Sequence, residues 1–494
     1  MNIKEAKEEI KHTVMAYLKK DEKGAYRIPA IRQRPILLMG PPGIGKTQIM
    51  EQIARECKIG LVSYTITHHT RQSAVGLPFI KEESFEGREY SVTEYTMSEI
   101  IASVYRRIRD YGNKEGILFI DEINCVSETL APTLLQFLQC KTFGNQAIPE
   151  GWIIVAAGNP PEYNKSVRDF DMVTLDRVRE LDVSADFRVW KSYAIEKRLH
   201  PAILSYLELR SKNFYRVEAD VDGLKFVTAR GWEDLSNLME LYEEMQIPVT
   251  EEVIGEFLHY EDVAGDFSAY LDLYHKYEDD YGIAEILEGR VKATVYARLE
   301  KAAFDEKFSV IHLLLDALLG HFYKVQTETQ VTDAWYQFLK EYRSNVETVQ
   351  KPEEYYVNLL NQEKNQFEEE KKAGFLNTDE IAVKERLIGC LAENAPKENG
   401  AKECFLNAKK GFDIQREKLE KEENVALTAL NHVFSFVEDA FGAGEEMVLF
   451  VTELTLNAAS SLFLARHTVE KYEQYKKELL VGTKKAELLT ELQR

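Results

Sequence analysis

The sequence predicts two kinds of structure in succession: an α/β domain with a parallel sheet flanked by helices, then a small helical lid and an all-α C-terminal domain. In the first half of the chain, short apolar runs alternate with amphipathic segments, which is typical of parallel strands joined by crossover helices. The runs at 36–39, 116–120 and 152–157 are each followed by glycine or polar residues. Beyond about residue 270 the apolar residues recur almost entirely at helical spacing.

The length of the chain fits this division. A chain of 494 residues has room for about two to four domains at roughly 150 residues each. We expect the large α/β domain at 1–195, the helical lid at 196–270 and the C-terminal helical domain at 271–494.

The first apolar run, Ile36–Met39, leads into the segment GPPGIGKT, which fits the pattern G-x-x-x-x-G-K-[ST] at every fixed position. Glycines let backbone N–H groups turn toward a phosphate chain, and the N-terminus of the following helix adds the positive end of its dipole. Lys46 can then reach the outer phosphates, and the Thr47 hydroxyl can ligate Mg²⁺. The residues expected to bind a nucleoside triphosphate are Gly40, Pro41, Pro42, Gly43, Ile44, Gly45, Lys46, Thr47 and Gln48.

A second strand is expected at Gly60–Ile66, which alternates and is rich in β-branched residues. Two extended runs near 79–80 and 90–95 are separated by a polar turn at Glu86-Gly87. They predict a β-hairpin inserted before a helix at Met97–Tyr111.

Two further runs place polar side chains after a buried strand. The run that begins at Gly116 ends in Asp121 and Glu122, which are expected to hold the Mg²⁺ shell and to polarise the attacking water as general base. The run that begins at Trp152 ends in Asn159, which is expected beside the γ-phosphate. Arg177 and Arg230 follow later in the chain. An isolated arginine is usually an ordinary surface residue, and only the order of the preceding motifs makes these two candidates for the site.

Composition excludes several other classes of protein. The formal charge of −21 argues against broad, non-specific binding of nucleic acid, which needs a basic surface. Five scattered cysteines without a C-x-x-C pair fit reduced thiols in the cytoplasm. The apolar segment 447–465 contains Glu453 and Asn457, so we expect a buried helix there and no membrane insertion.

Taken together, the motifs resemble those of AAA+ ATPases, and within them the MoxR-like, dynein-related group. The resemblance covers roughly residues 25–265, and the predicted hairpin at about 76–95 looks like the helix-2 insert of that clade. The matching segments are GPPGIGKT (40–47), ILFIDEIN (117–124), AAGNPP (156–161), TLDR (174–177) and TARGWEDL (228–235).

The resemblance implies a role for each residue. Lys46 and Thr47 would bind phosphate and Mg²⁺, Asp121 the metal and Glu122 the water. Asn159 would be the sensor that positions this water, Arg177 an arginine finger that reaches the neighbouring subunit's nucleotide, and Arg230 a second sensor on the lid. The family acts as a homo-oligomeric ring, usually a hexamer. Here Val178 follows Arg177 where the family often has Phe, so the finger stays open between Arg177 and Arg179, and Ala229 stands where a Pro often precedes the second sensor.

The resemblance also implies a function: ATP hydrolysis that drives remodelling, maturation or assembly of a protein complex, commonly with a partner that bears a von Willebrand factor A domain. Two alternatives are a nucleotide-gated assembly scaffold and, less favoured by the charge, a motor subunit that acts on nucleic acid. One branch of the family prefers GTP, so the choice between ATP and GTP stays open.

Overall fold

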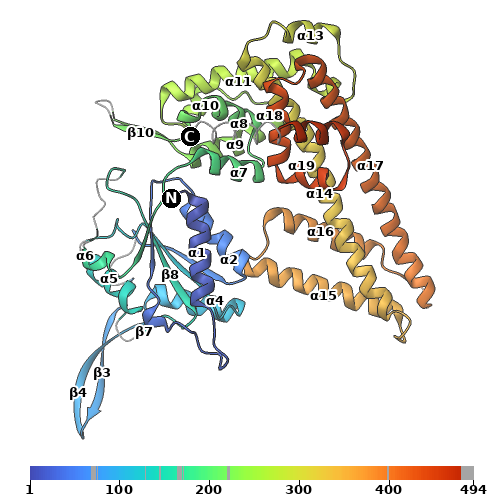
Figure 1. The fold of residues 1–494 in the computed structure, drawn as a ribbon. Helices are drawn as coiled ribbons and strands as arrows, with labels where there is room; N and C mark the ends of the chain where they lie inside the picture. Colours follow the sequence, from blue (N-terminus) through green and yellow to red (C-terminus); the bar gives the residue numbers. More distant parts are fainter. Residues whose placement is uncertain are drawn as a thin grey trace, which may run out of the picture. The chain divides into compact units, whose positions relative to one another are not determined.

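The computed structural model describes residues 1–67, 74, 76–127, 129–143, 146–163, 170, 172–219, 223–397 and 400–479. The chain forms two compact units. Unit 1 comprises Met1–Trp190, Tyr215–Gly231 and Glu369–Leu376, and unit 2 comprises Lys191–Phe214, Trp232–Glu368 and Asn377–Arg494. Unit 1 contains the main sheet, whereas unit 2 is helical (Figure 1). The predicted boundaries at 195 and 270 stay predictions.

The core of unit 1 is a five-stranded sheet in the order β2-β5-β8-β1-β9, with every neighbouring pair parallel. Its strands are β1 (Ile36–Met39), β2 (Gly60–Thr65), β5 (Gly116–Asp121), β8 (Trp152–Gly158) and β9 (Arg179–Asp182). This confirms the predicted parallel sheet flanked by helices. Strand β9 and its pairing with β1 were not predicted.

Both faces of the sheet are buried, which explains why β5 and β8 are continuous apolar runs. On one face, Phe119 and Val155 pack with residues of α1 (Ile3–Tyr17) and α2 (Lys46–Cys57). On the other face, Leu118 and Ile154 pack with residues of α4 (Glu99–Tyr111) and α5 (Ala131–Cys140). Alternate residues of one strand therefore serve two separate hydrophobic clusters.

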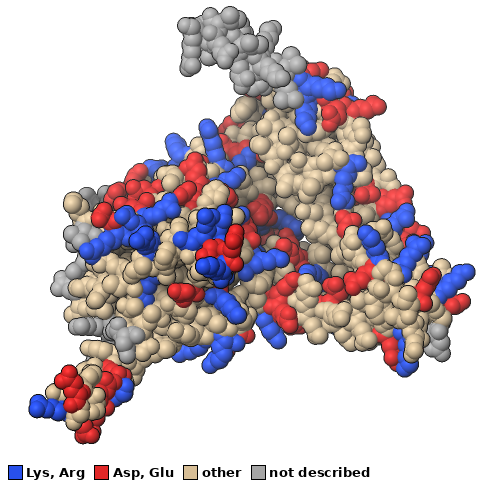
Figure 2. All heavy atoms as spheres, turned by 60° about the horizontal axis from the view of Figure 1, so that its bottom comes forward, with Lys and Arg blue, Asp and Glu red and all other residues tan. Residues whose placement is uncertain are grey.

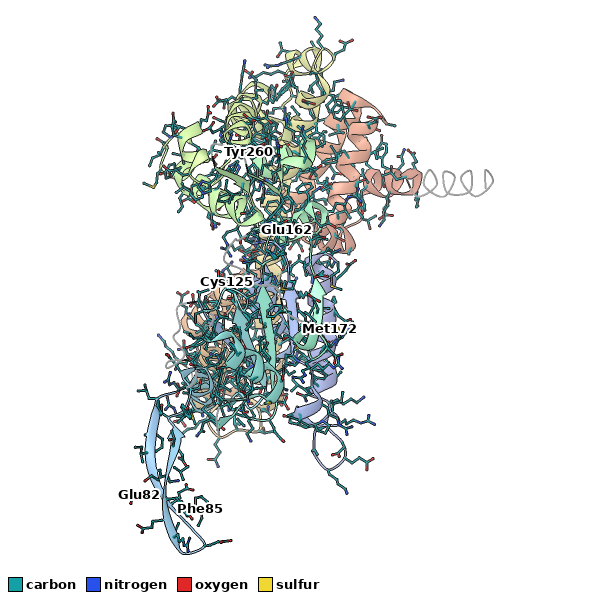
Figure 3. The ribbon with its side chains drawn as sticks, turned by 90° about the vertical axis from the view of Figure 1, so that its left-hand side faces the viewer. Glu82, Phe85, Cys125, Glu162, Met172 and Tyr260 are labelled. Carbon is teal, nitrogen blue, oxygen red and sulfur yellow. The ribbon has the colours of Figure 1, made fainter. Side chains whose placement is uncertain are left out.

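The inserted hairpin is confirmed, and it projects from the sheet domain (Figure 1). It consists of β3 (Pro78–Phe85) and β4 (Arg88–Tyr95), which pair with each other in a two-stranded sheet. Its turn, Glu86-Gly87, has positive φ at both residues, as the tight turns of β-hairpins require. Figure 3 shows the side chains of Glu82 and Phe85 on this projecting ribbon.

Short elements complete unit 1 and lead into unit 2. These are β6 (Thr142–Phe143), β7 (Gln146–Ala147), α6 (Met172–Leu175), α7 (Phe187–Glu196), β10 (Arg216–Ala219) and β11 (Leu224–Val227). The end of α15 also belongs to unit 1, where the Arg107 Nη2 of α4 donates a hydrogen bond to the Ala373 carbonyl at 2.6 Å.

Unit 2 is built around α14, a continuous helix of 42 residues that packs against α8, α11, α12 and α16–α19. Its helices are α8 (Pro201–Leu209), most of α9 (Ala229–Glu244), α10 (Glu251–Gly255), α11 (Glu261–Tyr281), α12 (Ile283–Leu287), α13 (Ala293–Leu299), α14 (Phe304–Asn345), most of α15 (Pro352–Ala373), α16 (Thr378–Glu393), α17 (Ala401–Phe441), α18 (Glu445–Leu456) and α19 (Ala458–Arg466).

The expectation of one buried helix at 447–465 was wrong. The segment forms α18 and α19, which are bent by 88° with respect to each other. Asn457 stands between them, and its side-chain oxygen accepts hydrogen bonds from the backbone N–H groups of Ala459 and Ser460. Such capping ends one helix and begins the next. Among the described helices, α14 is long and apolar enough to cross a membrane, although 61% of its apolar window is buried inside the protein.

Candidate active site

Three strand ends place the predicted site residues at one edge of the sheet. Strand β8 lies between β1 and β5, and all three run parallel. Their carboxyl ends therefore meet at the same edge, where ligands of open α/β sheets bind. This edge brings together the loop after Met39, the Asp121–Glu122 pair and Asn159.

The loop between β1 and α2 needs its glycines. Gly43 and Gly45 have φ angles of +73° and +93°, a region that L side chains rarely adopt. A Cβ on Gly43 would lie 3.0 Å from the Thr228 side chain, and a Cβ on Gly40 would lie 2.8 Å from the Val183 carbonyl oxygen. The backbone thus has a shape that only glycine permits, and it ends at the N-terminus of α2, where an anion is stabilised.

Lys46 lies inside this loop with only 8% of its surface exposed. Its ammonium donates hydrogen bonds to the carbonyl oxygens of Gly40 and Pro41 and to Asn159 Oδ1, at 2.7, 2.8 and 2.8 Å. Burial lowers the pKa of Lys46 to about 8, although the negative charges of Asp121 and Glu122 act in the opposite direction and raise it. The site therefore holds a desolvated cation beside the Asn159 side chain.

This lowered pKa predicts a pH-dependent affinity for nucleotide. Without nucleotide, Lys46 loses its proton as the pH rises through about 8. Bound phosphate favours the ammonium form, so binding above that pH must take up a proton. We expect the Kd for ATP to be constant below about pH 7 and to increase, as binding weakens, by up to about tenfold per pH unit above pH 8. Calorimetry in buffers of different ionisation enthalpy measures both the affinity and the proton uptake.

Two variants of Lys46 serve as controls for this experiment. Lys46→Arg keeps its charge throughout the range and should lose the pH dependence, because a guanidinium is not deprotonated in proteins. Lys46→Ala should bind ATP weakly at every pH. An affinity of the wild-type protein that stays constant from pH 7 to 10 would contradict the lowered pKa of Lys46, whereas unchanged ATP binding by Lys46→Ala would contradict its assignment to the phosphates.

Thr47 and Asp121 form a pair of oxygen donors suited to Mg²⁺. The Thr47 hydroxyl donates a hydrogen bond to Asp121 Oδ2 at 2.9 Å, and the backbone N–H of Glu122 donates to Asp121 Oδ1 at 2.9 Å. Hydroxyl and carboxylate oxygens are the ligands that Mg²⁺ prefers beside a phosphate chain. When bound there, the ion would neutralise phosphate charge, and Thr47 and Asp121 would hold it.

Glu122 follows the end of β5 in a strained conformation. Its φ angle is +56°, which is uncommon for a residue with a side chain and costs about 1 kcal/mol or more. The next residue, Ile123, anchors the turn through a hydrogen bond from its N–H to the Ala157 carbonyl at 2.9 Å. The turn therefore holds the Glu122 carboxylate, a candidate general base, at the edge where the strands end.

Asn124 is a site residue that the sequence reasoning missed as a functional position. It is buried, with 3% exposure, and it holds the backbone of Asn159 at two points. Its Nδ2 donates to the Asn159 carbonyl at 2.8 Å, and its Oδ1 accepts from the Asn159 N–H at 3.3 Å. A Cβ at Gly158 would lie 2.7 Å from Asn124 Oδ1, so these two hydrogen bonds also require glycine before Asn159. The signal in the sequence is the Asn two residues after Glu122.

Asn124→Ala is expected to lower kcat roughly tenfold to hundredfold, because the amide of Asn159 is then less well oriented. Removing the buried amide also leaves the Asn159 backbone groups without partners, at a cost of about 1–3 kcal/mol in the free energy of unfolding. Steady-state turnover and thermal unfolding of the same preparation separate the two effects. An unchanged kcat in a folded variant would remove Asn124 from the positioning role.

Arg177 and Arg179, the two candidate fingers, have different surroundings. Arg177 is exposed beyond α6, and its guanidinium hydrogen-bonds Gln139 of α5. Arg179 lies on β9, and its guanidinium forms an ion pair with Glu9 and a hydrogen bond with Thr13, both on α1. Arg179 is therefore committed to packing within unit 1.

Arg230 lies in the first turn of α9, next to the phosphate loop. Its backbone N–H donates to the Gly43 carbonyl at 3.1 Å, and its side chain is exposed. Thr228 caps the same helix through a hydrogen bond from the Gly231 N–H to its hydroxyl at 3.2 Å. Tyr215, which the sequence did not single out, donates its hydroxyl to the Pro42 carbonyl at 2.8 Å. The start of α9 is thus attached to the phosphate loop.

Comparison with known proteins identifies the domain. A scan against protein families matches residues 36–173 to the ATPase family associated with various cellular activities (AAA). A search of curated proteins finds no match to the chain. The matched segment contains β1, the phosphate loop, the Asp121–Glu122 pair and Asn159. Residues 36–173 are therefore an AAA ATPase domain, and the protein is a nucleoside triphosphate hydrolase.

Proposed function

We propose that this ATPase uses ATP hydrolysis to remodel, mature or assemble a partner protein complex, as the MoxR-like group does, and that it acts as a homo-oligomeric ring, a hexamer as in that group. The observation that carries the proposal is the path of α9. Its first turn, up to Gly231, belongs to unit 1 and hydrogen-bonds the phosphate loop, whereas the helix from Trp232 onward belongs to unit 2. A continuous helix therefore links the nucleotide site to the C-terminal helices.

Partly buried ion pairs join α7 and α8 to the C-terminal helices within unit 2. Lys191 of α7 pairs with Glu208 of α8 and, at 2.8 Å, with both carboxylate oxygens of Glu453 of α18. His312 of α14 lies 3.2 Å from the same Glu208. Lys191 and Glu453 are 17% and 14% exposed, so the loss of one partner would leave a partly desolvated charge, and the pairs favour keeping these helices together. In this proposal, the part of the predicted lid that belongs to unit 2 and the C-terminal helices move as one body.

A trans finger at Arg177 fits this proposal better than one at Arg179. Arg177 is exposed, whereas Arg179 is held by Glu9 and Thr13 of its own domain. An arginine supplied by a neighbouring subunit stabilises charge in the transition state of phosphoryl transfer. Asn159 as first sensor and Arg230 as second sensor complete the proposed set, with Mg²⁺ held by Thr47 and Asp121.

The projecting hairpin offers a surface for the partner protein. Ile80 is 75% exposed, and Phe79, Phe85 and Tyr90 are also exposed on β3 and β4. Apolar side chains gathered on a projecting ribbon favour contact with another protein. A partner that bears a von Willebrand factor A domain is the expectation from the group, and a cytoplasmic location fits the five free cysteines.

Two other functions are weaker candidates. A nucleotide-gated scaffold would use the same site residues but hydrolyse slowly. A nucleic-acid motor would need a basic surface, whereas the chain carries a net charge of −21 and the face in Figure 2 has acidic and basic side chains interspersed.

The test begins with Glu122→Gln loaded with ATP as bait and with ADP as control, to isolate an ATP-dependent partner. The purified partner is then added to the wild-type enzyme, and turnover of ATP and of GTP is measured. A remodelling ATPase should hydrolyse nucleotide faster when its partner is present, whereas a scaffold should hydrolyse it slowly with or without the partner. Acceleration by DNA or RNA alone would replace the proposal with the nucleic-acid motor.

A further inference from the structure

A groove in unit 2 lies between α11, α12, α14 and α17 and encloses about 1340 Å³. This exceeds the roughly 300–1,000 Å³ of a typical small-molecule pocket. Its lining extends along α17 from Glu417 to His432, a stretch of roughly 22 Å at the α-helical rise. The groove is therefore long enough for about four turns of a docked helix.

Carboxylates line two walls of this groove. They are Glu278 and Asp279 of α11, Glu285 of α12, Glu288 at its end, and Glu417 and Glu420 of α17. Glu288 is paired with Arg290, and Lys421 is the one lysine or arginine among the lining residues of the described chain. The remaining carboxylates give the groove an excess of negative charge that a cationic partner would neutralise.

Between these walls the lining is mixed, with apolar residues beside the polar His321, Asn424 and Thr428. Leu287 of α12 and Ala429 of α17 are buried in its lining, and Val425 of α17 is 42% exposed. The His432 Nδ1–H donates to the Leu287 carbonyl at 2.8 Å, which fixes α12 against α17. A Cβ on Gly289 would lie 2.8 Å from the His432 ring, so the approach of the two elements depends on glycine.

We propose that this groove binds a basic amphipathic helix of a partner protein. The apolar stripe of such a helix would lie on the exposed Val425 and Ala284, and its flanking Lys and Arg side chains would face the carboxylates of α11 and α17. A small polycation would match the charge but would leave the apolar strip exposed. The proposal rests on unit 2 alone and does not depend on the nucleotide site.

The test uses the full chain and a fluorescein-labelled synthetic helix of 16 residues, with leucines on one stripe and lysines and arginines on both flanks. Fluorescence anisotropy should show saturable binding that weakens with added salt. The triple variant D279K/E417K/E420K reverses three exposed rim charges and should weaken binding about tenfold or more. The matched control E368K/E393K/E470K reverses three exposed carboxylates outside the groove and should bind nearly as the wild type does.

Val425→Asp separates a helix site from simple charge attraction. It adds negative charge, so attraction alone would strengthen binding of the basic peptide, whereas our proposal predicts weaker binding because the apolar stripe loses its contact. Thermal unfolding verifies that each variant is folded. The proposal is overturned if the peptide does not bind, if D279K/E417K/E420K binds it normally, or if a scrambled peptide without the stripe or free spermine binds equally well.

Discussion

Glu122→Gln is expected to bind ATP with near wild-type affinity and to hydrolyse it about 10²- to 10⁴-fold more slowly. The substitution keeps the size of the side chain and leaves the Glu122 N–H free to donate to Asp121. It removes the carboxylate that the strained turn after β5 holds at the edge of the sheet. Lys46, Thr47 and Asp121, which would hold the phosphates and Mg²⁺, are unchanged.

Stopped-flow binding of a fluorescent ATP analogue and steady-state release of phosphate measure the two effects separately. Glu51→Gln is a matched control, because Glu51 is an exposed residue of α2, the helix that follows the phosphate loop. This control should hydrolyse ATP as the wild type does. Turnover of Glu122→Gln within tenfold of the wild type would assign the general base elsewhere.

Arg177→Ala is expected to reduce turnover by about 10³- to 10⁵-fold, the range observed when an arginine finger is removed. Because a finger acts on the neighbour's nucleotide, the loss should propagate through the ring. Mixing variant and wild-type subunits should then depress activity more than in proportion to the variant fraction. Turnover as a function of this fraction is the measurement.

Arg179→Ala separates a finger from a packing residue. It breaks the contacts of β9 with Glu9 and Thr13 on α1, so we expect a lower melting temperature and a proportional effect in mixtures. A linear loss of activity with Arg177→Ala, or disproportionate loss with Arg179→Ala, would contradict the assignment to Arg177.

The phosphate loop and the main strands could be predicted because each has a strong local signal. The strand at Ile36–Met39 and the one ending at Asp121 are buried on both faces, which leaves uninterrupted apolar runs. The hairpin followed from two extended runs and the Glu86-Gly87 turn. Parallel order alone then places the strand-end residues at one edge.

Strand β9 escaped prediction because it gives almost no such signal. It has four residues at the edge of the sheet, and of these only Leu181 is buried. Asn124 was missed for another reason: its role depends on Asn159, 35 positions away, and only the parallel pairing of β5 and β8 brings the two together. A single sequence does not reveal such a contact.

For the C-terminal half, the sequence predicted that the structure is helical but did not predict where the individual helices begin and end. Apolar residues recur at helical spacing in 310–322 and in 335–342, and both stretches belong to α14, because no residue between them breaks the helix. The bend between α18 and α19 depends on the capping bonds of Asn457, which an apolar run conceals. The hydrophobic pattern therefore indicates which residues are buried, whereas local polar contacts determine where each helix ends.

The most direct test of the account measures distances by electron paramagnetic resonance in Glu122→Gln, with few labelled subunits in each of the proposed rings. Spin labels at the exposed residues Lys114 of unit 1, Glu244 of α9 and Glu393 of α16 report on both units. We predict that the distance between Lys114 and Glu393 differs between the ATP and ADP states, whereas that between Glu244 and Glu393, both in unit 2, stays constant. The account would be contradicted if the distance between Lys114 and Glu393 were the same in the ATP and ADP states. It would also be contradicted if the distance between Glu244 and Glu393 changed, because unit 2 would then not move as one body.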